Sequence, residues 1–349
     1  MTNAVALAQG ASNNVTMRNR IINGAMVIDQ RNAGSAVTIS ANTNSFTLDR
    51  FRCDAPVGQS ITVQQVVDAP SGFYNSLKYT AGTASTNASD ASQIFCSVEG
   101  LNTTDLNWGT SSAQPITLSF WAKSSLSGTF GLTMENSAQN RCYVTSYSLP
   151  TANTWTYITK TILGDTTGTW LTNNGRGIVF RLDMGVGTSA SGAVTNAWSG
   201  AYYNGTTGVV KLTQNTGATF NVTGVQLEAG TTASPFEYRQ YGTELFLCQR
   251  YFQTITAAPG VTQNASTTTA DLNFQFRVDM RSTPTAVPAG AMKVTDTSAD
   301  YTQSSASISQ FYGNVTGARA YLPNFSGMTA LRPVFLRTDS PVIQLSAEL

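Results

Sequence analysis

The sequence predicts an all-β protein with two β-sandwich, jelly-roll-like domains in tandem and a short N-terminal arm. Charged residues make up only 11% of the 349 residues, while Thr, Val, Tyr and Phe, which favour strands, are frequent. Short strand-forming runs recur between Gly, Ser, Asn and Pro, as is typical of antiparallel sandwiches. The hydrophobic content of 41% is enough for more than one core.

Residues 1–20 are polar and cannot bury much surface by themselves. We expect an N-terminal attachment arm that becomes ordered against a partner, with a frayed end as the alternative. The segment lacks a basic start, and its apolar run is too short for a secretory signal, so no export signal is expected.

Residues 21–240 are predicted to form the first sandwich, because apolar and polar residues alternate along several of its runs. In the run 116–123, Trp121 falls on one face with Ser119 and Lys123, opposite an apolar face. The apolar faces of this run and of the run 178–184 consist of Ile116, Leu118, Phe120, Ala122, Ile178, Phe180, Leu182 and Met184.

The run 219–229 changes parity part-way along. Phe220 and Val222 face inward first, and Val225 and Leu227 do so afterwards. One extra residue reverses every later side chain, so the sequence predicts a β-bulge centred on Gly224.

A linker at 241–253 breaks the strand pattern. Leu245, Cys248 and Phe252 fall at helical spacing, so a short helix or an irregular link is expected. Residues 254–349 are then predicted to form the C-terminal β-sandwich domain. Its clearest strand is the run 271–281, with Leu272, Phe274, Phe276, Val278 and Met280 facing in and Asp271, Asn273, Gln275, Arg277, Asp279 and Arg281 facing out.

Composition excludes several function classes. Histidine is absent, which excludes catalytic triads with an imidazole base and His-containing zinc sites. A net charge of +1 gives no field to gather nucleic acid, and no apolar run is long enough for membrane insertion. No Asp-rich calcium loop or nucleotide-binding loop is present, so no metal and no cofactor are expected.

The four cysteines are widely spaced. Cys53, Cys96, Cys142 and Cys248 include no C-x-x-C pair and are too sparse for a disulfide framework in a chain of this length. We therefore expect them to be small, buried, reduced side chains.

Several phrases of the sequence occur together in a specific order. They are NRIINGAMVIDQRNAG with TLDRF, SFWAKSSLSGTFGLTMEN, LPTANTWTYITKTILGDTTGTW, and TGVQLEAGTTASPFEYRQYGTELFLCQRYF. Over residues 19–253 this series resembles the carbohydrate-binding-module-like jelly roll of phage tail-fibre and related virion proteins. Phe51 departs from the pattern, which often has Trp after the Asp-Arg pair, but it keeps an aromatic side chain.

The resemblance implies a virion structural protein that is assembled in the bacterial host cytoplasm. It implies a homotrimer that contacts other virion proteins of the tail or capsid, possible recognition of host cell-surface polysaccharide, and no catalytic residues. No heptad or collagen-like stretch specifies three chains, so the trimer rests on the resemblance alone.

Aromatic residues in polar loop contexts are the candidates for glycan binding, because a ring can lie against the C–H face of a sugar. They are Trp108, Trp170, Trp198, Tyr202 and Tyr203. The alternative, which we favour, is that they pack under loops or seal a subunit interface. By contrast, Trp155 alternates with Tyr157 in a predicted strand and is expected in the core.

Three arginines near the N-terminus, Arg18, Arg20 and Arg31, are candidates for attachment to the virion through acidic groups on a docking protein. Ion pairs within the chain are the alternative, and on a surface such pairs contribute only about 0–1 kcal/mol.

The sequence thus predicts a tail-fibre or receptor-binding subunit that adheres to host glycan without catalysis. The alternative from another class is a capsid decoration or head-fibre protein with a purely architectural role. A third, minor reading is a polysaccharide hydrolase, which needs two carboxylates facing one cleft. Glu99, Glu135, Glu228 and Glu237 lie on or beside predicted strands, but no pair of acidic residues stands out.

Overall fold

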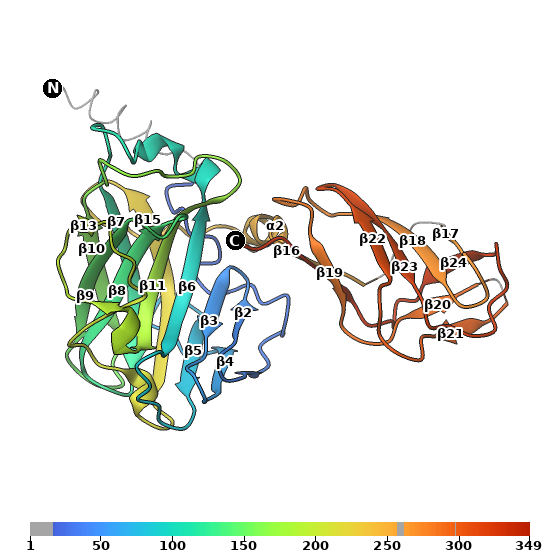
Figure 1. The fold of residues 1–349 in the computed structure, drawn as a ribbon, viewed down its shortest axis with the longest axis horizontal. Helices are drawn as coiled ribbons and strands as arrows, with labels where there is room; N and C mark the ends of the chain where they lie inside the picture. The colour runs from blue at the N-terminus through green and yellow to red at the C-terminus, as the bar shows by residue number, and fades with distance from the viewer. Residues whose placement is uncertain (1–16, 257–261, 297) are drawn as a thin grey trace. The chain divides into compact units, whose positions relative to one another are not determined.

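The computed structural model describes residues 17–256, 262–296 and 298–349, and it confirms the all-β prediction (Figure 1). Most of the expected arm, residues 1–16, lies outside the described residues. The chain divides into two compact units, Met1–Tyr241 and Gly242–Leu349. Each unit has its own hydrophobic core, so each is a β-sandwich unit in its own right.

The first unit consists of two antiparallel sheets. The six-stranded sheet has the order β1 (Val37–Ile39), β4 (Ile61–Val66), β5 (Ser76–Ala81), β15 (Thr219–Ala229), β7 (Ile116–Ser124) and β10 (Thr156–Ile162). The seven-stranded sheet has the order β13 (Trp198–Ser199), β9 (Cys142–Leu149), β8 (Gly128–Asn136), β11 (Arg176–Val186), β6 (Ala91–Glu99), β3 (Phe51–Asp54) and β2 (Asn44–Leu48).

Short elements complete the first unit. A parallel pair joins β12 (Ser191–Gly192) to β14 (Gly205–Thr206). The 3-10 turns are η1 (Gly100–Asn102), η2 (Thr104–Leu106), η3 (Thr188–Ala190) and η4 (Leu212–Gln214).

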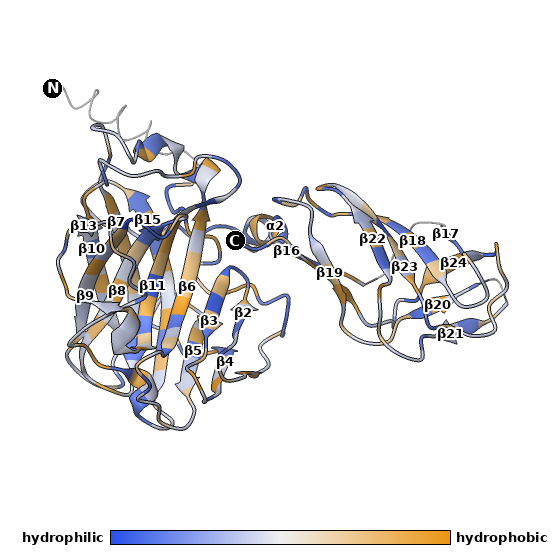
Figure 2. Cartoon of the chain, in the orientation of Figure 1, coloured by the Kyte–Doolittle hydropathy of each residue, from blue (hydrophilic) through white to orange (hydrophobic). Residues whose placement is uncertain are grey.

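The inward faces of the two sheets form the core of the first unit. The residues predicted to form the apolar faces of β7 and β11 are all buried, each no more than 1% exposed. Figure 2 shows hydrophobic and hydrophilic residues interspersed along the strands, as the alternation requires. Each large apolar side chain buried here contributes about 1.5–3 kcal/mol to folding, so the core stabilises the sandwich.

The predicted β-bulge is confirmed. The register of β15 against β7 shifts between Thr223 and Gln226, and Gly224 lies between them with a φ of 61°. Val222 before the bulge and Val225 after it both face the core. The bulge therefore keeps apolar side chains inside along the whole strand.

The second unit holds three small sheets around one core. Helix α2 (Tyr241–Gln249) lies where the linker was expected, and β16 (Phe252–Ile255) follows it. The sheets have the orders β16, β25 (Ile343–Ser346), β19 (Thr285–Pro288); β17 (Thr262–Gln263), β24 (Pro333–Leu336), β20 (Lys293–Thr295), β21 (Asp300–Thr302); and β18 (Ala270–Gln275), β23 (Gly317–Leu322), β22 (Gln310–Gly313).

The predicted long strand over 271–281 is wrong in its length, because β18 ends at Gln275. The backbone N–H of Phe276 still donates to the Thr316 carbonyl in register with β23, whereas that of Arg277 donates to the side chain of Gln253. Asp271 is also not an exposed residue: it is 6% exposed and forms an ion pair with Arg319 on the paired strand β23.

The four cysteines are free and buried, as the sequence predicts. Burial raises the pKa of Cys142 to about 11 and that of Cys53 still further above its usual range. The thiols of Cys53 and Cys142 are therefore protonated near neutral pH, and burial shields all four thiols from reagents.

We expect none of the four thiols to react quickly with a thiol-specific disulfide reagent in the native protein, because the thiolate is the nucleophile and the side chains are inaccessible. All four should react in denaturant. Time-resolved absorbance of the released thiol measures this, and fast native-state labelling of even one cysteine would contradict the burial described here.

Candidate functional site

A pocket of about 500 Å³ opens on the outer face of the six-stranded sheet. We call it the aromatic pocket. Its lining residues are Ser71, Phe73, Ser119, Trp121, Tyr157, Gly224, Ala233, Ser234, Pro235, Phe236 and Tyr238. They come from the loop before β5, from β7, β10 and β15, and from the tail segment that follows β15, here defined as residues 230–240.

The rings in the pocket form two groups. Trp121 and Tyr157 are partners in the β7–β10 ladder, and their ring centroids are 5.3 Å apart. Phe73, Phe236 and Tyr238 form a second group with centroid separations of 5.0–5.5 Å. Contact distances of this kind fix the orientation of aromatic rings. The pocket thus presents preformed ring faces to solvent.

Gly224 permits the two ring groups to approach each other. A Cβ atom built on Gly224 would lie 2.6 Å from Cζ of Phe73 and 3.1 Å from Cδ1 of Trp121. Its φ of 61° is also in the left-handed region, which side-chain-bearing residues rarely adopt. The bulge glycine is therefore required both by the backbone and by the pocket.

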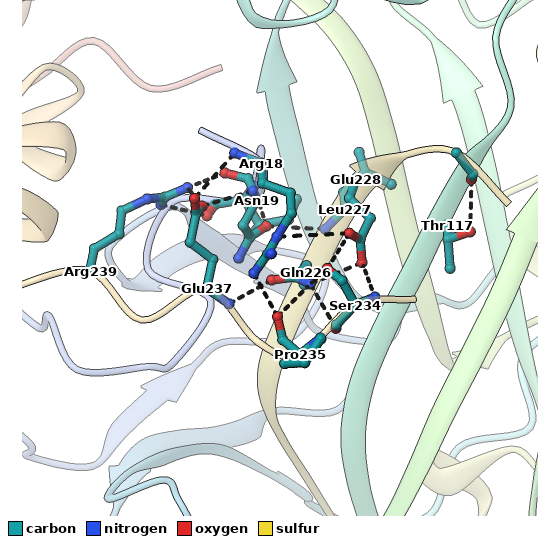
Figure 3. Close-up of polar contacts among 12 residues, drawn as sticks. Arg18, Asn19, Thr117, Gln226, Leu227, Glu228, Ser234, Pro235, Glu237 and Arg239 are labelled. Carbon is teal, nitrogen blue, oxygen red and sulfur yellow. Dashed lines mark hydrogen bonds and ion pairs between the residues drawn. The ribbon is translucent and has the colours of Figure 1, made fainter. Parts of the chain in front are cut away.

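Buried polar contacts hold the tail segment over the sheet (Figure 3). Glu228, 3% exposed, accepts hydrogen bonds from the Ser234 amide at 2.9 Å and the Ser234 hydroxyl at 2.5 Å. Gln226 donates to Glu228 at 2.9 Å, and its own side-chain oxygen accepts from the Glu237 amide at 2.8 Å. These bonds fix both ends of the segment that carries Pro235 and Phe236.

The N-terminal segment of the described chain is bound into the same contacts. The amide of Asn19 donates to the Glu237 carboxylate at 2.8 Å, and Arg239 donates to that carboxylate at 3.1 Å. The Asn19 side chain also accepts from the Leu227 amide and donates to the Val225 carbonyl. Figure 3 shows Arg18 and Asn19 beside these groups. The two ends of the first unit are thus held together at the edge of β15.

The pocket carries free hydroxyl groups and no charge. None of its lining residues is Asp, Glu, Lys or Arg. Within the part of the chain that the structure describes, the hydroxyls of Ser71, Ser119 and Tyr157 have no hydrogen-bond partner. Ring faces beside a few unpaired hydroxyls suit a neutral ligand rich in C–H and O–H groups.

Trp155 lies on the same outer face, and the prediction that it belongs to the core is wrong. It is partly exposed, and Tyr157, its neighbour in alternation, is 44% exposed. Lys123 lies 5.1 Å from the Trp155 ring and pairs with Asp68 at 2.5 Å. The alternation was read correctly, but it did not show which of the two faces holds Trp155.

The three loop tryptophans proposed as glycan binders meet one another edge to face. Ring centroids of Trp108, Trp170 and Trp198 are 4.6–5.2 Å apart, and Trp108 is only 8% exposed. Each indole N–H donates within the chain: to Gln114, to Asp165 and Thr167, and to Leu163, respectively. The three therefore pack at the edge of the core rather than forming a flat exposed surface.

The two candidate tyrosines lie elsewhere. Tyr203 is half-buried with its ring over Gly192. Tyr202 is 39% exposed, and its hydroxyl accepts a hydrogen bond of 3.0 Å from Gln139. None of the five candidates lines the aromatic pocket. Sequence reasoning missed Trp121, although a large aromatic on an outward face next to a bulge was a usable signal.

The arginines proposed for virion attachment are engaged within the chain. Arg18 donates to the Pro235 carbonyl at 2.7 Å and lies 3.9 Å from Glu228. Arg20 pairs with Asp105 at 2.6 Å. Arg31 lies 3.6 Å from the buried Asp49.

The glutamates considered for hydrolysis have structural partners. Glu135, 1% exposed, pairs with Arg181, and Glu228 and Glu237 hold the tail segment. Among the described residues, no group of three or more Cys, Asp or Glu is placed to hold a metal ion. No helix in the described ranges has the length and apolar character to cross a membrane.

Comparison with solved structures shows distant similarities. No protein-family model matches the chain, and no curated protein matches it. Among solved structures, the enzymatically active domain of tailspike protein 4 of bacteriophage CBA120 aligns over 61% of this chain and 21% of its own, at 11% identity and a TM-score of 0.32. This chain thus spans about a fifth of that tailspike domain.

Two sugar-binding proteins are also similar. A putative sugar-binding protein from Bacteroides thetaiotaomicron aligns over 61% of this chain and 100% of its own, at 11% identity and a TM-score of 0.32. A family 11 carbohydrate-binding module from Clostridium thermocellum aligns over 59% and 96%, at 13% identity and a TM-score of 0.28. Scores this low establish neither the family of this chain nor its ligand.

Replacing Gly224 with Ala should destabilise the first unit and open the aromatic pocket, because the new Cβ would meet Phe73. Gly217→Ala is the matched control, since Gly217 has a φ of 72° and nothing within 4 Å of its Cβ position. We expect the control to lower the free energy of unfolding by about 1 kcal/mol, because of backbone strain alone. Gly224→Ala should lower it by about 1–3 kcal/mol more, because of overpacking. Urea unfolding measures both, and equal losses would show that Phe73 does not limit the site.

Replacing Glu228 with Gln should destabilise the first unit by about 2–4 kcal/mol, because the amide would face the two Ser234 donors within a buried network. Asp105→Asn is the control: Asp105 also pairs with an arginine, but its side chain is 61% exposed, so the loss should stay below about 1 kcal/mol. Chemical denaturation measures the free energy of unfolding of both variants. Equal losses in the two variants would contradict the role given to Glu228.

Proposed function

We propose that this chain is a bacteriophage virion protein, a tail-fibre or receptor-binding subunit that binds host-surface glycan without catalysis. The observation that carries the binding part is the aromatic pocket, where the Trp121 and Tyr157 rings lie beside free hydroxyls. Its volume of about 500 Å³ is within the range of small-molecule sites. The virion part is supported by the ordered series of phrases in residues 19–253 that resembles tail-fibre jelly rolls.

The character of the pocket favours a neutral sugar. A sugar ring has an apolar C–H face that can pack on an aromatic ring, while its hydroxyls need hydrogen-bond partners. Trp121 and Tyr157 provide the rings, and Ser71 and Ser119 provide hydroxyls. A charged ligand would find no opposite charge among the lining residues.

Adhesion rather than turnover is supported by the state of the carboxylates. Hydrolysis of a glycosidic bond needs an acid and a second carboxylate facing the same bond. Glu228 lies close to the pocket but is saturated by Ser234 and Gln226. A single-site affinity that is weak would be strengthened by the copies of a proposed trimer, since linked sites can multiply affinity by about 10²–10⁴.

The aromatic pocket is tested with a glycan array of neutral bacterial surface sugars, followed by calorimetry on the best ligand. Trp121→Ala should weaken binding at least about tenfold, equivalent to about 1.4 kcal/mol. Tyr74→Ala is the control, because Tyr74 is 70% exposed and does not line the pocket. If the wild type and Trp121→Ala have equal affinity for the sugar, the aromatic pocket is not its binding site.

The virion part is tested by immunogold microscopy on intact particles and by competition of the purified protein with phage adsorption. Gold on the tail with inhibited adsorption would support a receptor-binding subunit. Gold over the head with no effect on adsorption would favour the capsid decoration or head fibre, and unlabelled particles would contradict any virion role.

A further inference from the structure

A second polar site lies on the seven-stranded sheet, away from the aromatic pocket in the sandwich. Phe95 on β6 faces outward yet is fully buried, because three guanidinium groups cover its ring. Their central carbons lie 4.2 Å (Arg52), 5.1 Å (Arg176) and 4.7 Å (Arg181) from the ring centroid. We call these three residues the arginine cluster.

The sheet itself brings the cluster together. Arg52 on β3 and Arg181 on β11 are the two ladder partners of Phe95, one on each side of β6. Arg176 begins β11 and reaches the same ring. A cation within about 6 Å of an aromatic face is attracted to it, but three cations at one ring also repel one another.

The three arginines differ in their pairing. Arg52 forms a two-pronged ion pair with Asp54, with distances of 2.8 and 3.0 Å. Arg181 is paired with Glu135. Arg176 forms no hydrogen bond or ion pair with any described residue, although Glu99 stands opposite it in the β6–β11 ladder. One guanidinium of the cluster therefore has no direct hydrogen-bond or ion-pair partner among the described residues.

The surroundings of Arg176 make that charge costly. Burial and the neighbouring charges of Arg181 and Arg52 lower the pKa of Arg176. An arginine keeps its proton at physiological pH even so, so the molecule retains the repulsion. The Nε atom of Arg181, buried in the same cluster, also lacks a hydrogen-bond partner among the described residues.

The cluster is open to solvent at Arg176 and Arg52. Arg176 is half-buried, and the Arg52 side chain is 20% exposed. A guanidinium without an ion-pair partner thus lies where solvent reaches the cluster.

We propose that Arg176, flanked by Arg52 over the Phe95 ring, binds an oxyanion such as the carboxylate or phosphate group of an acidic saccharide. The planar fork of a guanidinium matches both groups through paired hydrogen bonds. The bound anion neutralises the one unpaired charge of the cluster, while Asp54 and Glu135 keep their own arginines. This site complements the aromatic pocket, whose lining carries no charge.

The experiment titrates the full chain with sodium phosphate, sodium glucuronate and glucose by calorimetry, at an ionic strength held constant with sodium chloride. Phosphate, glucuronate or both should bind, and glucose should not bind at the cluster. Binding of phosphate alone identifies a phosphorylated source, and binding of glucuronate alone identifies a carboxylate source.

Arg176→Gln should weaken oxyanion binding at least tenfold, and Arg176→Lys, which keeps the charge but loses the fork, should fall between it and the wild type. Lys160→Gln on β10 is the control, because it removes one positive charge from the other sheet. This variant should bind the oxyanion with the same affinity as the wild type. The midpoint of thermal unfolding should not fall in Arg176→Gln, because the change relieves repulsion and breaks no ion pair.

The proposal is overturned if neither anion binds to the wild-type chain, or if Arg176→Gln binds as tightly as wild type. It is also overturned if Lys160→Gln loses as much affinity, since the effect would then be one of net charge. If Arg176→Gln does not fold, the oxyanion affinity of Arg176→Lys is compared with that of the wild type. Equal affinities of these two proteins would contradict the proposed site.

Discussion

The hydrogen bonds of Gln226, Glu228 and Glu237 hold the first unit closed. Asn19 and Glu237, more than two hundred positions apart, meet here, and backbone hydrogen bonds of Arg20 with Leu227 and of Val225 with Gly24 add to the side-chain contacts. Gln226 and Glu228 are buried, and a buried polar atom without a partner is costly. The network therefore specifies one path for the tail segment, and that path carries Pro235, Phe236 and Tyr238 into the aromatic pocket.

The two faces of the sandwich have different chemistry. On the six-stranded sheet, hydroxyls and rings line a pocket without charge. On the seven-stranded sheet, ionisable side chains are concentrated: Arg181 pairs with Glu135, and Lys211 pairs with the buried Asp183. The low overall charge of the chain concealed this, because opposite charges on one face cancel in the total. The structure shows an uncharged pocket on one sheet and densely paired charges on the other.

The sequence predicted the all-β fold, the core-facing residues and the bulge, since each depends on local alternation. The sequence-based prediction was wrong where alternation alone could not show which face of a strand is buried. Trp155 was assigned to the core from alternation alone, which gives the period and not the side on which the core lies. The loop tryptophans posed the opposite problem: their polar neighbours suggested exposure, but Trp108 donates its N–H to a carbonyl and packs against two other indoles. Contacts between distant segments, such as Arg176 with Phe95, leave no mark on local sequence.

The bulge at Gly224 connects the fold to the site. If β15 kept its parity through residue 224, Gln226 and Glu228 would point into the apolar core, and Val225 and Leu227 would point out. The extra residue reverses this, so that Val225 and Leu227 are buried in the core while Gln226 and Glu228 reach the tail segment on the outer face. A bulge needs a residue that tolerates a left-handed backbone, and glycine does so without a side chain that would strike Phe73. One residue thus sets the strand's parity, the anchoring of the tail and the floor of the pocket, which explains why the TGVQLE stretch, with SPFEYR after it, forms one structural unit.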